Sequence, residues 1–127
     1  MTPLEDVEIL LVEDNPNDVE LTLRALQKQN LSSKVFVVKD GAEALMTIGR
    51  ERVDLMLLDV DLPFIDGHSL LQAVRENGLE IPAIFISGLP GEEVEIKAFE
   101  VGAADFIRKP VKNNILLARV AKVLNVE

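Results

Sequence analysis

The chain has 127 residues, a formal net charge of −9 and no cysteine. The length is that of one domain, long enough to bury a core without a disulfide or metal. The lack of cysteine excludes thiol catalysis and fits a reducing, cytoplasmic compartment, and the excess of acid argues against direct nucleic-acid binding. No apolar run approaches the roughly 20 residues of a membrane span. We therefore expect a single domain over residues 1–127 with no direct contact to nucleic acid or membrane.

Apolar runs and amphipathic segments alternate along the chain. The apolar runs predict strands at residues 7–12, 34–38, 53–58, 81–86 and 104–107. The amphipathic segments, several of them preceded by Asn or Asp caps, predict helices at about residues 16–29, 41–49, 66–77, 91–102 and 111–124. Such alternation is typical of a parallel sheet with helices on both faces. Right-handed crossovers and one reversal of winding then predict a doubly wound, flavodoxin-like (βα)5 α/β fold with strand order 2-1-3-4-5.

Polar side chains stand where four of the predicted strands end. Glu13 and Asp14 follow the first strand, Asp59 the third, Ser87 the fourth and Lys109 the fifth. In doubly wound sheets, ligands bind outside the carboxyl ends of the strands, next to the point where the winding reverses. That point lies between the first and third strands, so we expect Asp59 to share a crevice with Glu13 and Asp14.

Three carboxylates in one crevice predict a cation site. Their repulsion raises the pKa of at least one of them unless a cation enters, and Mg²⁺ prefers oxygen ligands and also takes phosphate. The Ser87 hydroxyl and the Lys109 ammonium are suitable phosphate partners. Together these groups suit an aspartyl phosphate at Asp59. Taken singly, each has an ordinary alternative as a turn carboxylate, a helix N-terminal acid or a surface lysine, but chance explains their joint placement poorly.

The chain resembles a response-regulator receiver domain over nearly its whole length. The matching segments are Leu-Leu-Val-Glu-Asp-Asn (10–15), Asp-Gly-Ala-Glu-Ala-Leu (40–45), Leu-Leu-Asp-Val-Asp-Leu-Pro-Phe-Ile-Asp-Gly (57–67), Phe-Ile-Ser-Gly (85–88) and Gly-Ala-Ala-Asp-Phe-Ile-Arg-Lys-Pro (102–110). The resemblance implies that Asp59 accepts a phosphoryl group from the phosphohistidine of a sensor histidine kinase or histidine phosphotransfer protein. It implies Mg²⁺ as cofactor, with Asp14 a direct ligand, Glu13 a ligand mostly through water, and further ligands from Asp59 and the main-chain carbonyl of Asp61.

The resemblance also implies a signalling switch that catalyses its own phosphorylation and dephosphorylation, rather than an enzyme with a separate substrate. Ser87 would bond a phosphoryl oxygen, Lys109 would pair with the phosphate, and Phe106 would be the switch aromatic. The Lys109-Pro110 bond is expected to be cis. With no output domain in the sequence, we expect the signal to pass by contact with a downstream protein. The implied contact face is the fourth helix, fifth strand and last helix, with these candidates: Ile96, Lys97, Phe106, Lys112 and Ile115.

Three positions depart from the usual family pattern or extend it. Ser87 stands where threonine is common, and it keeps the hydroxyl. Phe106 stands where tyrosine is common, and it can turn inward behind Ser87 but has no hydroxyl to pair there. Asp61 places an acid two residues after the acceptor, and we hypothesise that it alters the lifetime of the aspartyl phosphate.

Other functions have weaker support. Asp59-Val60-Asp61 resembles the Asp-x-Asp of haloacid-dehalogenase-type phosphatases, but two strands precede it and no acidic pair follows the fifth strand. A phosphorylation-independent binding module on the same fold is the main alternative. A flavin or dinucleotide binder would need a Gly-rich phosphate loop after the first strand, which this chain lacks. Of the remaining side chains, we expect His68 to be exposed, and Met46 and Met56 to fill the core.

Overall fold

The computed structural model describes residues 6–28 and 34–124. Its strands are β1 (Glu8–Val12), β2 (Lys34–Val38), β3 (Leu55–Leu58), β4 (Ala83–Ser87) and β5 (Asp105–Arg108). Its helices are α1 (Pro16–Lys28), α2 (Gly41–Arg50), α3 (Gly67–Glu76), α4 (Glu92–Glu100) and α5 (Asn113–Leu124). All neighbouring strands are parallel and their order is β2-β1-β3-β4-β5, which confirms the predicted topology. The predicted end of the first helix near Gln29 lies outside the described residues.

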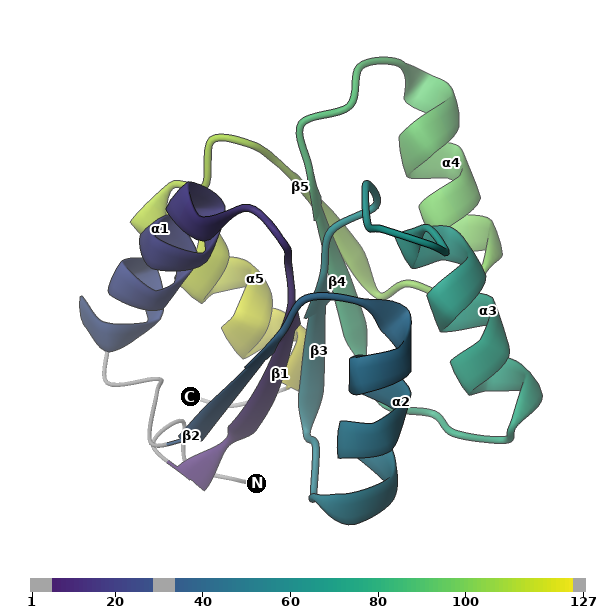
Figure 1. Ribbon diagram of the computed structural model, residues 1–127. Coiled ribbons are helices and arrows are strands. Elements are labelled where there is room, and N and C mark those ends of the chain that lie inside the picture. The colour runs from purple at the N-terminus through teal and green to yellow at the C-terminus, as the bar shows by residue number, and fades with distance from the viewer. Residues whose placement is uncertain (1–5, 29–33, 125–127) are drawn as a thin grey trace.

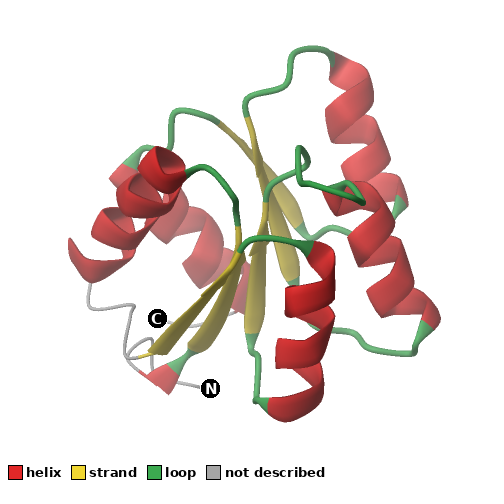
Figure 2. Ribbon diagram, viewed as in Figure 1, coloured by secondary structure: helices red, strands yellow, loops and turns green. Residues whose placement is uncertain are grey.

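Helices cover both faces of the sheet (Figure 1). Helices α1 and α5 lie on one face, and α2, α3 and α4 lie on the other. Figure 2 shows the strands as one layer between these two groups of helices. Among the described residues, no helix has the length and apolar character needed to cross a bilayer.

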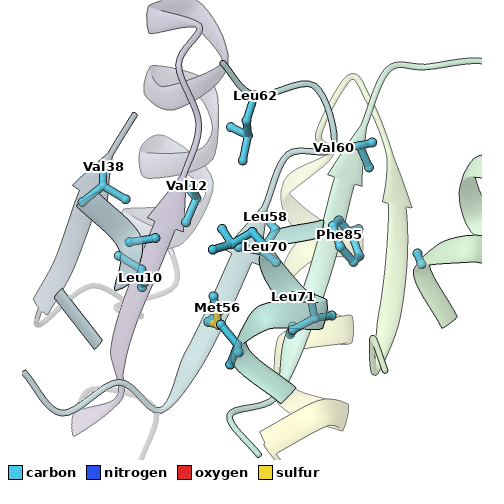
Figure 3. Packing of buried hydrophobic residues seen from close by; sticks show 14 of the residues in the cluster. Leu10, Val12, Val38, Met56, Leu58, Val60, Leu62, Leu70, Leu71 and Phe85 are labelled. Atoms are coloured by element: carbon cyan, nitrogen blue, oxygen red, sulfur yellow. The ribbon is translucent and has the colours of Figure 1, made fainter. Parts of the chain in front are cut away.

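The side chains of the central strand β3 alternate between two hydrophobic cores. Met56 and Leu58 belong to the core beneath α2, α3 and α4 (Figure 3), whereas Leu55 and Leu57 belong to the core beneath α1 and α5. All four are fully buried. The unbroken apolar run before Asp59 therefore reflects burial on both faces, as expected for a central parallel strand.

Side-chain caps fix the starts of α1, α2 and α3. Asn15, Asp40 and Asp66 each accept a hydrogen bond from a backbone N–H three residues further on. At α2 the Glu43 carboxylate accepts a bond from the N–H of Lys39 in return. These helices begin at the carboxyl edge of the sheet, so the caps set the position of the loops that surround the predicted site.

Two expectations about single side chains were wrong. His68 is buried: its ring lies 5.3 Å from the Phe85 ring between centroids, and its Nε2 lies 3.1 Å from the Val94 carbonyl oxygen. Met46 is 59% exposed, because it lies on the side of α2 that faces away from the core, whereas Met56 is in the core as expected. Helical periodicity alone did not show which side of each helix meets the sheet.

Candidate functional site

The backbone bonding of the sheet continues one residue past three of its strands. Three amides donate to the last carbonyl of a neighbouring strand: Glu13 to Val38 (3.0 Å), Asp59 to Val12 (3.0 Å) and Lys109 to Ser87 (2.9 Å). These bonds hold the side chains that follow the strands at fixed positions along one edge. The predicted meeting of Glu13, Asp59 and Lys109 is therefore observed, and its cause is the register of the sheet.

Lys109 lies at the centre of this cluster. Its Nζ donates to Glu13 Oε1 at 2.8 Å, to Asp18 Oδ2 at 2.9 Å and to Asp59 Oδ2 at 3.2 Å. An ammonium has three protons, so these bonds use its full donor capacity. The Lys109 side chain is only 15% exposed, and those of Glu13 and Asp59 are 3% and 6% exposed. Charge pairs so far from water are screened much less than surface pairs.

Glu13, Asp14 and Asp59 together form a candidate metal site. Each offers a carboxylate oxygen, and these atoms all lie within 4.8 Å of one another. Asp14 is exposed, whereas Glu13 and Asp59 are buried. Hard carboxylate oxygens with one open side suit Mg²⁺, which keeps several water ligands. The donor set therefore fits the cation that the sequence predicted.

The pKa values of Glu13 and Lys109 are shifted by burial and by the charged groups that surround them. Burial raises the pKa of Glu13 to about 7; the hydrogen bond from Lys109 opposes this, and neighbouring Asp59 adds to it. Burial alone would lower the pKa of Lys109, but hydrogen bonds to Glu13 and Asp18 outweigh it and the pKa is raised. Lys109 thus stays charged near neutral pH. The prediction that one clustered carboxyl has a raised pKa is confirmed, at Glu13.

A cleft of about 490 Å³ opens beside this cluster. Its lining residues come from the loops at the carboxyl edge and from the start of α1: Asp14, Asn15, Pro16, Asp18, Asp59, Asp61, Gly88, Leu89 and Lys109. The N–H of Asp61 donates to Asp59 Oδ1 at 3.3 Å, and the Asp61 side chain is exposed at the rim. The role of the Asp61 carbonyl as a ligand stays a prediction.

Ser87 and Phe106 lie behind the cleft. Ser87 is fully buried, and its Oγ accepts a hydrogen bond from the N–H of Leu89 at 3.1 Å. Phe106 is 7% exposed and pairs with Phe85 across β4 and β5. The Arg108 guanidinium lies 4.9 Å from the centre of the Phe106 ring. The aromatic side chain is therefore turned inward and is not an exposed member of the predicted contact face. The Lys109-Pro110 bond is cis, as expected.

Asp18 is the residue at this site that sequence reasoning missed. It stands in the first turn of α1, where an acid is ordinarily explained by the helix dipole. The Asn15 side chain accepts bonds from the N–H groups of Asn17 and Asp18, which fixes the start of this helix at the cleft. The sequence did contain a signal for Asp18. It is an acid just after a predicted helix cap, and that helix begins at the edge of the sheet that carries the other acids.

Comparison with known proteins identifies close similarity to one family. A family model described as the response regulator receiver domain matches residues 9–121. The transcriptional regulatory protein PcoR of Escherichia coli is 33% identical over 116 residues, which make up 91% of this chain and 50% of PcoR. The chain spans about half or less of the length of the curated relatives it matches.

Solved structures agree with this similarity. One match is the receiver domain of sensor histidine kinase PA1611 from Pseudomonas aeruginosa PAO1, which has a magnesium ion coordinated in its active site cleft. It is 31% identical, with a TM-score of 0.82 over 94% of this chain and 98% of that one. The signal receiver domain of a signal transduction histidine kinase from Syntrophus aciditrophicus is 32% identical, with a TM-score of 0.82 over 94% and 90%.

Proposed function

The chain belongs to the response regulator receiver domain family, and we propose that Asp59 accepts a phosphoryl group from a phosphohistidine of a partner protein. The observation that carries the proposal is the buried Asp59 carboxylate, 3.2 Å from the Lys109 ammonium and beside Glu13 and Asp14. The proposed partner is a sensor histidine kinase or a histidine phosphotransfer protein. Receiver domains within sensor histidine kinases are among the relatives, which supports this class of partner.

In the proposed step, an oxygen of Asp59 forms a bond to phosphorus as the P–N bond of the phosphohistidine breaks. The electron pair of that bond returns to the imidazole of the donor, which then takes up a proton. Lys109 stabilises the negative charge on the phosphoryl oxygens. Held by Glu13, Asp14 and Asp59, Mg²⁺ would add positive charge at the same place. Water later hydrolyses the acyl phosphate, which releases phosphate and restores the carboxylate; the chain thus acts on itself and has no separate substrate.

The proposed readout begins at Ser87. Its hydroxyl, now paired with the Leu89 amide, would bond a phosphoryl oxygen and so alter the loop between β4 and α4. Arg108 connects that loop to β5, because its guanidinium donates to the carbonyls of Leu89 and Gly91 while lying over Phe106. Near-complete switching between two arrangements takes about 5 kcal/mol of differential affinity.

We propose a protein target for the surface formed by α4, β5 and α5. The exposed candidates on it are Ile96, Lys97, Lys112 and Ile115. A cytoplasmic location is part of the proposal and is supported by the absence of cysteine.

The test is labelling with acetyl phosphate, with and without Mg²⁺, read by intact mass. We expect the wild type to gain one phosphoryl group only with the metal, and Asp59→Asn to gain none. Asp6→Asn is the matched control, because Asp6 is exposed and lies away from the cleft. No gain by the wild type under any condition would reject acceptor chemistry and favour a phosphorylation-independent binding module.

A further inference from the structure

Phe64 has two unusual properties for a phenylalanine. It lies in the loop between β3 and α3, and it is 95% exposed. Its φ is 72°, and it is the only non-glycine residue with a positive φ among residues 6–28 and 34–124. A bulky side chain in the left-handed region strains the backbone. The positive φ belongs to a three-residue turn that the bond from the Ile65 N–H to the Pro63 carbonyl closes at 2.9 Å. An exposed ring gains no burial in return for the strain, so packing within the fold does not explain its exposure.

The loop that carries Phe64 is held in place by backbone hydrogen bonds and by a buried side chain. The Val60 carbonyl accepts bonds from the N–H of Leu62 (3.1 Å) and of Gly67 (2.8 Å), which closes the loop at its foot. The Leu62 side chain is buried in the core (Figure 3). At Gly67 a Cβ would lie 2.2 Å from the Asp59 carbonyl oxygen, so the glycine lets the loop pack against the acceptor residue.

Ile65 anchors the other side of the loop. Its Cδ1 would lie 2.7 Å from a Cβ at Gly41, so the Ile65 side chain, which is 39% exposed, packs against the start of α2 at this glycine. Leu62 and Ile65 thus fix the chain on both sides of Phe64. The ring is presented to solvent by a braced turn.

Phe64 is close enough to Asp59 to be covered by a protein that reaches the acceptor with an interface of standard size. Phe64 is five positions after Asp59, and a fully extended chain of that length would reach about 18 Å. The loop is far from extended, because the bond from the Gly67 N–H to the Val60 carbonyl closes it, so the two residues lie well within that limit. A standard interface buries about 800 Å² on each partner, equivalent to a disc about 16 Å in radius. Figure 1 shows the β3–α3 loop at the same edge of the sheet as the loops that follow β1, β4 and β5. A protein that places a phosphohistidine in the cleft therefore lies over or beside Phe64.

We propose that Phe64 is the docking anchor for the phosphohistidine-bearing protein, with its ring in an apolar pocket of that partner. This inference rests on the proposed function. Aromatic residues, phenylalanine among them, are enriched in protein interfaces, and a few well-packed side chains there carry most of the binding energy. The ring is placed to dock the partner, and the phosphoryl group itself reacts with Asp59.

The charge around the cleft favours such a partner over a second copy of this chain. Five carboxylates surround one ammonium there, from Glu13, Asp14, Asp18, Asp59 and Asp61 around Lys109. The whole chain carries −9, so two copies would repel each other across this face. The expected partner surface is an apolar pocket bordered by basic side chains.

The experiment compares two phosphoryl donors on the same variants. The small donor is acetyl phosphate, which needs no docking; the protein donor is a purified histidine phosphotransfer domain charged with phosphoramidate, chosen from a panel as the one that labels the wild type fastest. Phe64→Ala removes the ring, Phe64→Gly removes the ring and the backbone strain, and Phe64→Tyr keeps an aromatic ring. Leu79→Ala is the matched control, because Leu79 is 38% exposed and precedes β4 at the opposite edge of the sheet.

With the protein donor, we expect Phe64→Ala and Phe64→Gly to lower kcat/KM at least about tenfold, and Phe64→Tyr and Leu79→Ala to stay near the wild type. Labelling by acetyl phosphate should be equal in all of them. Phe64→Gly should also raise the thermal midpoint, because glycine tolerates the positive φ. Slower transfer from the protein donor in a variant of higher stability separates docking from damage to the fold.

Equal rates from the protein donor in the wild type and Phe64→Ala would overturn the inference. A wild-type dimer in sedimentation velocity that Phe64→Ala abolishes would also overturn it, by assigning the ring to a second copy. Failure of the wild type to react with acetyl phosphate would instead reject the proposed function, and the docking role with it. This outcome can be told apart from failure of the docking role alone, because it affects every variant alike.

Discussion

Lys109 Nζ lies 2.9 Å from Asp18 Oδ2, although 91 residues separate the two in the sequence. The bond joins the first turn of α1 to the segment after β5. It gives the ammonium a third carboxylate partner besides Glu13 and Asp59. Lys109 is thus fully paired, and a phosphoryl group must replace one of these partners when it arrives.

Asp18→Asn should speed labelling by acetyl phosphate severalfold at low salt. The substitution removes a negative charge that repels the donor at the cleft, and it weakens one competitor for Lys109. Salt screens interactions of this kind, so the gain should shrink as ionic strength rises. The measurement is the initial labelling rate at several salt concentrations, with Glu100→Gln as an exposed control at the far end of α4. An unchanged rate at low salt would show that Asp18 does not limit access to Asp59.

Glu13→Gln should stabilise the metal-free protein above neutral pH. The pKa of Glu13 is raised to about 7 in the fold, so the folded state binds this proton more tightly than the unfolded chain does. Its contribution to stability is present below about pH 4.5 and is lost as pH rises through 7. We expect a gain of the order of 2–3 kcal/mol at pH 8 that fades towards pH 5. Urea unfolding with a chelator measures it.

Added Mg²⁺ supplies the control for Glu13→Gln. The cation favours ionised carboxylates, so it should raise the stability of the wild type more than that of the variant. An advantage of Glu13→Gln that is constant from pH 5 to pH 8 would contradict the titration of Glu13 as its cause.

Asp61→Asn should change the dephosphorylation rate severalfold. The Asp61 side chain stands at the rim of the cleft and its N–H already bonds Asp59 Oδ1. A carboxylate there can hold the attacking water or repel the phosphoryl dianion, and asparagine does either less well. The loss of label after removal of the donor gives the rate, and equal lifetimes would reject a role for this acid. Steady turnover of a phosphomonoester that Asp61→Asn abolishes would instead revive the phosphatase alternative.

His68→Phe should lower the free energy of unfolding by about 1 kcal/mol. Because the Val94 carbonyl can only accept, His68 Nε2 carries the proton and donates to it at 3.1 Å. Phenylalanine keeps the contact with the Phe85 ring but not this bond between α3 and α4. Amide exchange in α4 should become faster than exchange in α1, which His68 does not contact. Uniform exchange in both helices would rule out a local tether.

Asp66→Ala should destabilise the protein by about 1 kcal/mol near neutral pH, because it removes the cap of α3. Burial acts to raise the pKa of Asp66, but hydrogen bonds from Ser69 and the charges of neighbouring His68 and Lys97 lower it overall. A lowered pKa means that the stabilisation is present above the unfolded value of about 4 and is lost as pH falls further. Asp66→Asn, which keeps an acceptor, should lose less. A difference from the wild type that does not shrink in acid would contradict this account.

Much of the fold and part of the site could be predicted because they depend on local patterns. The apolar runs predicted all five strands, and Asn15, Asp40 and Asp66 predicted three helix starts. Parallel strands bring their carboxyl ends to one edge, so the positions of Asp59 and Lys109 in the sequence were enough to predict that they meet. The roles assigned to them in phosphoryl transfer stay predictions for the labelling experiment.

The sequence by itself determined the strand order, the acidic edge and the raised pKa expected there, since each follows from periodicity, chain direction and charge. Only the tertiary structure decided which partners a side chain meets across the fold. It showed that Asp18 reaches Lys109, that His68 packs against Phe85, and that Phe64 is held outward with a positive φ. The physical reason is that these contacts depend on the rotation of helices against the sheet and on the path of a loop, which no local pattern of residues specifies.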